Sequence, residues 1–311
     1  MREVNKKDVT IIIVTFKSVH IIDQSLKNIV GKGYPIIIVD NASGDNIEEF
    51  LKKNYPSSGI ELILMANNYG FGRANNVALE KVTTKYAFIQ NPDAIIDENA
   101  IDNLISEAYK DDKIALANPF PIRKINSSKE EKEDDTMDYK NKIKILKEDE
   151  SIIETNFICG GYVLMNMSIF RKIGFFDKNL FLYGEDVELS NRSIQNGYKN
   201  ILVKNSFVFH YGQKSTKIQG SLENYKMLYF RQWHQGWAKS YLRRRKSNYF
   251  KIWFKTIIQF FSSFIYLVIL DKKHLVIRLA RSFGSAANLM GIDCFNKSNK
   301  IVQIKKTLKI R

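Results

Sequence analysis

The first 120 residues alternate between short apolar runs and segments with helical spacing, and this alternation constrains the fold more than any other feature of the chain. The run 9–16 is largely β-branched, and the apolar residues of the segment 18–30 recur at helical spacing. The pattern repeats in the pairs 36–40 and 46–54, 60–66 and 73–82, and 86–90 and 97–110, and ends with the run 114–118. Continuous apolar strands are buried on both faces, as in a mostly parallel sheet covered by crossover helices. We therefore predict an α/β fold with a doubly wound, Rossmann-like sheet.

Charge divides the chain into two parts. The segment 226–311 holds nineteen Lys and Arg and two Asp, a net charge of +17, whereas residues 1–225 carry a net charge of −2. A chain of 311 residues, 44% of them apolar, can bury one large core or two smaller ones. We therefore predict a near-neutral body over 1–225 and a helical, basic, amphipathic extension over 226–311, whose basic tail 296–311 is assigned no fold. A third segment, 120–150, has seventeen charged residues out of 31 and is predicted to be a solvated insertion in the body.

Two features bear on the compartment. Cys159 and Cys294 are the only cysteines and lack metal-ligand spacing, so we expect two inert thiols in a reduced, cytoplasmic setting. The N-terminal apolar run is short and β-branched, and no small-residue cleavage site follows it. We therefore predict that it is the first strand rather than a signal peptide.

Polar residues follow each of the first four apolar runs, where ligands bind in a doubly wound sheet. They are Thr15 after the first run, Asp40 and Asn41 after the second, Asn67, Gly70 and Gly72 after the third, and Asn91 and Asp93 after the fourth. A carboxylate at such a strand end can accept a hydrogen bond from a ribose hydroxyl or from a pyrimidine N–H. The alternative is that Asp40 and Ser43 cap the helix near residue 46.

The glycines at 70 and 72 indicate either a phosphate cradle or a tight turn into the next helix. A dinucleotide fingerprint needs a third glycine at position 75, where this chain has Asn75, so a nicotinamide site is disfavoured. Asp93 follows a proline whose fixed φ helps to present the carboxylate. One such carboxylate suffices for a hard divalent cation that also binds a diphosphate, and a helix-starting turn is the competing interpretation.

The second half of the body supplies further candidates. Gly160 and Gly161 lie in the apolar run 157–165, which we predict to be a strand that a ligand or a neighbouring segment approaches closely. A helix is predicted over 185–196, with Glu185 and Asp186 in its first turn, where the helix dipole favours acidic residues. These side chains either complement the dipole or provide an ionised general base. His210 directly follows the run 201–209. A histidine at this position is either structural or a ligand-binding residue.

The order and spacing of these motifs resemble family 2 inverting glycosyltransferases of the GT-A fold. The resemblance covers about residues 8–240 and is carried by VTIIIVTF, IIIVDNASGDN, NNYGFGRANNVAL, FIQNPDAII, GGYVLMNMSIFRKIGFFDKNLFLYGEDVELSNR and VFHYGQKS. The sequence is most similar to the bacterial rhamnosyltransferase-like branch, which builds surface polysaccharides. The resemblance implies a fold of the nucleotide-diphospho-sugar transferase type.

The resemblance also implies roles for individual residues. The nucleotide sugar would be bound by Thr15, Asp40, Asn41, Asn67, Gly70, Gly72, Asn75, Asn91 and Asp93. The acceptor would be bound by Gly160, Gly161 and Tyr183. Asp93 takes the metal-binding place of the family's Asp-x-Asp signature, whose first acidic position is Asn91 here, and His210 would complete a site for Mg²⁺ or Mn²⁺. Asp186 stands where the family places its catalytic base, and Glu185 is the neighbouring candidate.

The reaction that the resemblance implies is a single in-line displacement. A sugar such as rhamnose would pass from a dTDP- or UDP-linked donor to a hydroxyl of a lipid-linked polysaccharide precursor. Asp186 would take the proton of that hydroxyl as its oxygen attacks the anomeric carbon.

The basic end is predicted to bind a membrane surface. The segment 252–270 is strongly apolar, but its uncharged stretch 256–270 has fifteen residues, fewer than the about 20 that span a bilayer. Its polar residues form one stripe on a helix, and a second segment, 274–290, has a similar stripe. Such helices lie in the interface of anionic membranes. We therefore expect 243–290 to hold the protein on the inner face of the cell membrane; the alternative is a helical pair packed on the body.

Two other functions compete with glycosyl transfer. A nucleic-acid-binding protein would use the basic end, but no recognised module is present and the basic residues are interleaved with aliphatic runs, so no nucleic acid partner is expected. A catalytically silent scaffold is the other, and the joint presence of Asp40, Asp93, Asp186 and His210 argues against it. For the assembly state, monomer and homodimer both remain open.

Overall fold

The computed structural model of the protein describes residues 5–97, 99–122, 151–210, 221–245, 247–295 and 301–310. Most of the predicted charged insertion, 123–150, lies outside these residues, as do the residues that follow His210 up to 220.

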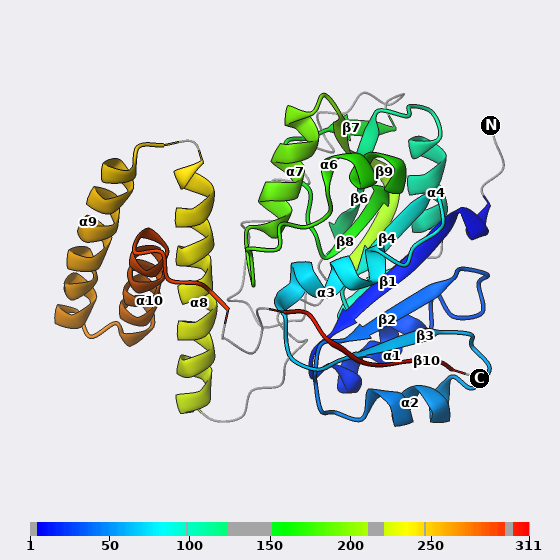
Figure 1. The fold of residues 1–311 in the computed structure, drawn as a ribbon, viewed down its shortest axis with the longest axis horizontal. Helices are drawn as coiled ribbons and strands as arrows, with labels where there is room; N and C mark the ends of the chain where they lie inside the picture. Colours follow the sequence, from blue (N-terminus) through cyan, green and yellow to red (C-terminus); the bar gives the residue numbers. More distant parts are fainter. Residues whose placement is uncertain are drawn as a thin grey trace.

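A ten-stranded sheet forms the centre of the described structure (Figure 1). Its strand order is β10-β3-β2-β1-β4-β8-β6-β9-β5, and β7 pairs with β9. The strands are β1 (Val9–Thr15), β2 (Ile36–Asp40), β3 (Glu61–Met65), β4 (Tyr86–Gln90), β5 (Ala94–Ile96), β6 (Ile114–Ile122), β7 (Ile152–Glu154), β8 (Tyr162–Asn166), β9 (Lys199–His210) and β10 (Ile304–Lys309). The first four strands are parallel to one another, as are β6 and β9, whereas β8, β5, β7 and β10 join the sheet antiparallel.

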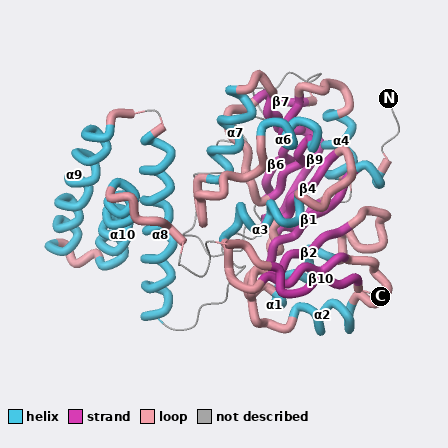
Figure 2. Tube along the Cα trace, viewed as in Figure 1, coloured by secondary structure: helices cyan, strands magenta, loops and turns pink. Residues whose placement is uncertain are grey.

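Helices cover both faces of the sheet (Figure 2). In the body they are α1 (Val19–Leu26), α2 (Ile47–Asn54), α3 (Gly70–Leu79), α4 (Ala100–Ala108), α6 (Met167–Ile173) and α7 (Glu185–Gln195), after a short 3-10 helix, η1 (Lys6–Asp8). Alternate residues of β1 point to opposite faces, so Ile11 and Ile13 join one apolar core with Leu26, and Ile12 joins a second core with Ala78. This two-sided burial is the reason that the strands read as continuous apolar runs.

The α/β fold, its central sheet and the helical C-terminal region are therefore confirmed. The predicted strand 157–165 is shorter than expected: β8 begins at Tyr162, and Gly160 and Gly161 lie in the turn before it. The physical reason is that this turn packs against the end of β4, where the N–H of Asn91 donates to the carbonyl of Gly161 at 2.6 Å. The three-residue strand β5 was not expected, because so short a segment shows no periodicity.

Three helices follow the body: α8 (Ser221–Arg244), α9 (Tyr249–Val268) and α10 (Lys272–Leu289). Helix α8 lies between the body and the other two helices, and α9 is the outermost (Figure 1). A small apolar core joins α8 to the body; it contains Leu180 of the body, Trp237 and Ala238 of α8, and Phe295. No helix within the described part of the chain is long and apolar enough to cross a membrane.

The sequence analysis assigned no structure to the last sixteen residues. After α10 the chain returns to the sheet, where β10 pairs antiparallel with β3, from Ile304 opposite Met65 to Lys309 opposite Glu61. The pairing places a basic strand along the edge of β3, so the C-terminal segment covers a sheet edge that would otherwise expose unpaired backbone groups.

Candidate active site

The carboxyl ends of the parallel strands β1, β2, β3 and β4 meet at one edge of the sheet. The register pairs Thr15, the last residue of β1, with Asp40, the last residue of β2. The segment 67–72 follows β3, and Asn91 follows β4. The polar residues predicted to bind the nucleotide sugar therefore come together at a single edge, as the doubly wound pattern requires.

Asp40 belongs to a loop that it helps to close. Its carboxylate accepts hydrogen bonds from the N–H of Ser43, at 3.2 Å and 3.3 Å, and the Ser43 hydroxyl accepts one from the N–H of Lys17 at 2.9 Å. Burial raises the pKa of Asp40, partly offset by the bonds from Ser43. The cap of α2 is instead Asn46, which makes no side-chain capping bond. Helix capping, the alternative role for Asp40 and Ser43, is therefore not what the structure shows.

Asn41 shapes the segment after β3. It is buried, and its side-chain amide donates to the Asn68 side chain at 3.0 Å and to the Gly70 carbonyl at 3.2 Å. Its side-chain oxygen accepts the N–H of Tyr69 at 2.9 Å. All these partners are protein groups, so Asn41 holds the loop that leads into α3.

The two glycines of this loop lie against the segment that leads to α7. A Cβ on Gly70 would stand 2.0 Å from the carbonyl oxygen of Phe181, and the φ of +77° also favours glycine. The next N–H, that of Phe71, donates to the same carbonyl at 3.1 Å. A Cβ on Gly72 would lie 3.1 Å from the Phe176 side chain. These glycines therefore permit contact between the donor-side loop and the 176–181 segment.

Other residues that are predicted to bind the nucleotide sugar carry buried polar atoms. Thr15 and Asn75 are both 0% exposed. The hydroxyl of Thr15 and the side-chain oxygen of Asn75 have no hydrogen-bond partner among the described residues. The Asn75 amide donates to the Phe71 carbonyl at 2.9 Å, and the Asn67 amide donates to the Tyr69 hydroxyl at 3.3 Å. Buried acceptors of this kind are rare in folded proteins and are common at ligand sites.

The end of β4 brings Asn91 and Asp93 next to two other segments. A Cβ on Gly161 would lie 2.6 Å from the Asn91 side-chain nitrogen, so Gly161 makes room for that amide. Asp93 is 6% exposed. The next residue, Ala94, pairs in the sheet with His210, so the backbone places His210 beside Asp93.

Asp93 and the backbone position of His210 make up the predicted metal site. A carboxylate and an imidazole from adjacent strands form a suitable donor pair for Mg²⁺ or Mn²⁺, and a diphosphate would complete the coordination. The described residues contain no group of three or more His, Cys, Asp and Glu side chains that could hold a metal without such help. The side chain of His210 lies outside them.

Glu185 and Asp186 begin α7, directly after two residues with positive φ, Tyr183 at +68° and Gly184 at +82°. The Asp186 carboxylate accepts the N–H of Val187 at 2.8 Å. A Cβ on Gly160 would lie 3.4 Å from the Cβ of Asp186. The turn at Gly160 thus approaches Asp186 closely while its neighbour Gly161 makes room for Asn91, which brings the predicted base and the predicted donor side together.

The two carboxylates differ in their surroundings. Burial, followed by the neighbouring Asp186 charge, raises the pKa of Glu185 to about 8, and burial also raises the pKa of Asp186. One carboxylate oxygen of Glu185 is buried without a hydrogen-bond partner among the described residues. Asp186 has the bonds from the backbone of Val187 and Gly160, which favour its ionised form. Burial therefore raises the pKa of both carboxyls, and Asp186 has the larger number of backbone bonds that stabilise its ionised form.

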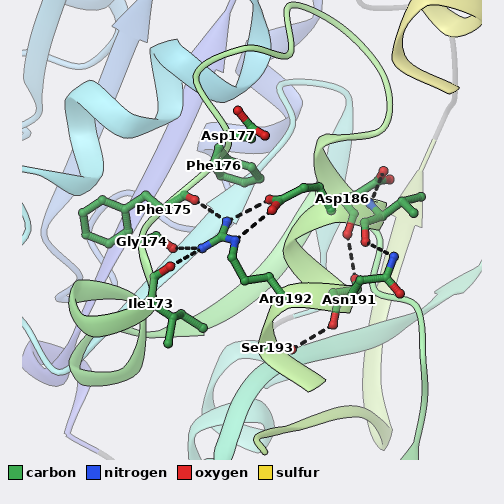
Figure 3. A network of polar contacts seen from close by, with 12 residues as sticks. Ile173, Gly174, Phe175, Phe176, Asp177, Asp186, Asn191, Arg192 and Ser193 are labelled. Atoms are coloured by element: carbon green, nitrogen blue, oxygen red, sulfur yellow. Dashed lines mark hydrogen bonds and ion pairs between the residues drawn. The ribbon is translucent and has the colours of Figure 1, made fainter. Parts of the chain in front are cut away.

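The sequence analysis missed the residue that fixes α7 to the body. Arg192 donates from its guanidinium to the Glu188 carboxylate, at 2.9 Å from two nitrogens, and to the Ile173 carbonyl at 2.7 Å. It also donates to the carbonyls of Gly174 and Phe175 (Figure 3). Five contacts from one side chain lock the turn after α6 onto α7, the helix that carries Asp186. An Arg near the end of a helix gives no sequence signal of such a role.

Helix α8 contacts the turn that precedes α7. A Cβ on Gly184 would lie 3.1 Å from the Leu242 side chain and 3.3 Å from Ala238. Phe181, three residues before Gly184, stacks on His234 of α8 with the ring centroids 4.8 Å apart. Tyr183, the predicted acceptor-binding residue, lies between these two contacts in the chain. Helix α8 therefore packs against the turn that carries this residue.

The fold and this edge-of-sheet site define a glycosyltransferase. Residues 10–174 match the signature of the Glycosyl transferase family 2, and the chain belongs to that family.

Curated relatives are bacterial polymer synthases. The chain is 23% identical over 195 residues to poly-β-1,6-N-acetyl-D-glucosamine synthase of Staphylococcus aureus (strain COL), covering 61% of this chain and 47% of the relative. The enzyme of the same name from Staphylococcus epidermidis (strain RP62A) is 26% identical over 176 residues, which are 54% of this chain and 41% of the relative. The chain thus spans about half the length of the curated relatives it matches.

Solved structures share the fold. The mannosyltransferase PcManGT from Pyrobaculum calidifontis, in complex with GDP-Man and Mn²⁺, has a TM-score of 0.60 at 14% identity, over 93% of this chain and 89% of that one. GalNAc-T7 with UDP, GalNAc and Mn²⁺ has a TM-score of 0.52 at 15% identity, over 75% and 47% of the two chains. Residues 1–349 of S. aureus TarS with UDP-GlcNAc have a TM-score of 0.50 at 12% identity, over 73% and 66%.

Proposed function

We propose that this protein is an inverting glycosyltransferase that moves a sugar from a nucleotide-diphosphate donor to a hydroxyl of a lipid-linked polysaccharide precursor. Family membership supports the transfer of a sugar, and the polymer synthases among the relatives support a polysaccharide product. The observation that carries the proposal is the carboxylate pair at the start of α7. The pair directly follows Tyr183 and Gly184, and Asp186 packs against Gly160.

The donor is proposed to be linked to dTDP or UDP. The sequence motifs favour rhamnose, because they are most similar to the rhamnosyltransferase-like branch. The curated relatives, which are named as synthases of an N-acetylglucosamine polymer, favour N-acetylglucosamine as a second candidate, and TarS, which shares the fold, was solved with UDP-GlcNAc. The buried acceptor atoms of Thr15 and Asn75 and the carboxylate of Asp40 supply polar groups for the nucleotide.

The proposed reaction assigns the role of proton acceptor to Asp186. Asp186 accepts the proton of the acceptor hydroxyl while that oxygen forms a bond to the anomeric carbon. The bond from the anomeric carbon to the diphosphate breaks in the same step, and the nucleoside diphosphate leaves with the electron pair. Because attack and departure occur on opposite sides of the carbon, the configuration inverts. Positioned proton acceptors of this kind contribute about 10²–10⁴-fold in rate.

Asp93 and His210 are proposed to hold the divalent cation, and Mn²⁺ in two transferases that share the fold supports this choice. When bound, the cation supplies positive charge that stabilises the leaving diphosphate. Asn91 precedes Asp93 by two residues and contacts Gly161. The Asn91 side chain therefore joins the proposed metal site to the turn at Gly160 and Gly161.

The test compares Asp186→Asn with Glu185→Gln. A panel of nucleotide sugars with detection of released diphosphate first identifies the donor, and thermal shift with UDP, dTDP and GDP in the presence of Mn²⁺ measures nucleotide binding. We expect Asp186→Asn to keep nucleotide binding and to lose transfer by at least about 100-fold. Glu185→Gln keeps most of the transfer. Transfer at the wild-type rate by Asp186→Asn would remove Asp186 from the role of base.

A further inference from the structure

Helix α9 is built with its bulky apolar residues on the outside. The residues that it buries are Ile252, Thr256 and Ser263. On the opposite face, side chains three or four positions apart are 52–81% exposed: Phe250, Phe254, Ile258, Phe261, Ile265 and Val268. This spacing places all six on a single face of the helix. The helix therefore buries Thr256 and Ser263 beside Ile252 and exposes most of its large apolar residues.

The predicted polar stripe of α9 is thus only partly correct. Ser263 belongs to the buried face, and the Ser262 hydroxyl accepts a bond from Arg278 of α10 at 3.0 Å. Only Lys251 and Lys255, in the first two turns, are exposed. The sequence showed that the helix has two faces but not which of them packs against the neighbouring helix.

The contacts among the three helices include several at small and hydroxyl side chains. A Cβ on Gly236 of α8 would lie 2.1 Å from the Arg281 carbonyl oxygen of α10, and one on Gly284 would lie 2.0 Å from the Trp233 carbonyl oxygen. The hydroxyls of Thr256 and Ser285 lie 2.8 Å apart between α9 and α10. Close backbone approach through Gly, with Ser and Thr hydrogen bonds across the helices, is also common between helices in lipid.

Positive charge flanks the apolar face at both ends. Lys251 and Lys255 lie at the start of α9, and Lys272 and Lys273 lie at the start of α10, just after the end of α9. From 247 to 290 the chain has six Lys and Arg against one Asp, a net charge of +5. A contiguous apolar face on a soluble protein marks a binding surface, and the charge around it selects a negatively charged partner.

The basic residues at both ends of α9 favour a helix that lies along a surface. Its 20 residues extend about 30 Å at 1.5 Å per residue, a length that fits either orientation. No helix of the described structure is suited to crossing a bilayer, and the basic residues at both ends belong in the head-group region. The helix is also the one farthest from the sheet, so its outer face is free of the body (Figure 1).

We propose that the outer face of α9 docks on the surface of an anionic lipid leaflet, with the aromatic and aliphatic side chains in the interface and the lysines at the phosphate groups. In the cell this leaflet would be the inner face of the membrane. The inference does not depend on the proposed function, because it uses only the C-terminal helices. Through α8, which contacts Gly184, the docked helices would hold the catalytic turn at a fixed distance from the lipid.

The test is co-sedimentation of the full-length protein with vesicles of phosphatidylcholine alone or of phosphatidylcholine with 30% phosphatidylglycerol. Wild type is expected to bind the anionic vesicles at least about tenfold more tightly, because each lysine near the surface contributes roughly fivefold. The triple variant Phe254→Glu, Phe261→Glu, Ile265→Glu is expected to lose binding. The matched control is Ile301→Glu, which replaces an apolar residue of 74% exposure outside these helices and keeps binding.

Three outcomes would overturn the proposal. The first is a triple variant that still sediments with the anionic vesicles. The second is equal binding of wild type to both kinds of vesicle. The third is a wild-type dimer in light scattering that the triple variant converts to monomer, since a second copy of the chain would then cover the face. Circular dichroism and donor hydrolysis in the absence of vesicles, both unchanged in the variant, show that the protein is folded and that any loss of docking is separate from the proposed activity.

Discussion

The carboxylate pair at the start of α7 gives the sharpest prediction. The pKa of Glu185 rises from 4.5 to about 8 because the side chain is buried next to Asp186. In the unfolded chain both groups ionise at their ordinary values. The folded protein therefore binds more protons than the unfolded chain between pH 4.5 and 8, and the free energy of unfolding must fall as the pH rises through this window.

The magnitude follows from the size of the shift. One pKa unit corresponds to 1.36 kcal/mol, so ionising buried Glu185 costs of order 3–5 kcal/mol above pH 8 and less than about 1 kcal/mol at pH 5. Glu185→Gln replaces the carboxyl by a neutral group of similar shape and removes this pH-dependent cost. For a chain of this size, roughly 2 °C in Tm corresponds to 1 kcal/mol. Between pH 5 and pH 9 the difference in this cost is about 2–4 kcal/mol, so the variant should gain about 4–8 °C relative to wild type over this range.

The assay is the difference in Tm between variant and wild type, measured at constant ionic strength from pH 5 to pH 9. Asp112→Asn is the matched control, because it makes the same carboxyl-to-amide change at a side chain that is 91% exposed. A Glu185→Gln difference that stays constant over the same range would refute the buried, protonated state of Glu185. It would also remove the argument that Asp186 is the ionised member of the pair.

Three further variants or treatments test the rest of the site. Arg192→Lys keeps the charge but loses most of the five contacts that tie α7 to the turn after α6. The free energy of unfolding should therefore fall by about 2–4 kcal/mol in urea denaturation. An unchanged midpoint would show that these contacts do not stabilise the fold. Gly70→Ala would place a Cβ 2.0 Å from the Phe181 carbonyl oxygen at a φ of +77°; we expect a loss of about 1–3 kcal/mol and a higher KM for the donor, whereas wild-type values would show that the contact is dispensable. Chelation of divalent metal should abolish stabilisation by the nucleotide and added Mn²⁺ should restore it; stabilisation that survives chelation would argue against a metal at Asp93 and His210.

The sequence by itself determined the parallel half of the sheet and where the site lies. Apolar runs of five to eight residues separated by helical segments have few solutions other than strands covered on both faces, and the polar residues at the strand ends are then forced to one edge. The acidic first turn of α7 was predictable for the same reason, since the position of Glu185 and Asp186 depends on local helix signals alone.

Only the tertiary structure decided which contacts these residues make. Gly160 and Gly161 looked like strand residues, but the turn that they form is shaped by Asn91 and Asp186, which lie far from them in sequence. The C-terminal strand β10 has no apolar pattern of its own and forms because β3 offers an unpaired edge. The sequence of α9 predicts two faces, and only the structure shows that the face with Ile252, Thr256 and Ser263 is the buried one. A local sequence pattern reflects interactions between residues that are near one another in the chain. The contacts named here form between surfaces that meet only after folding.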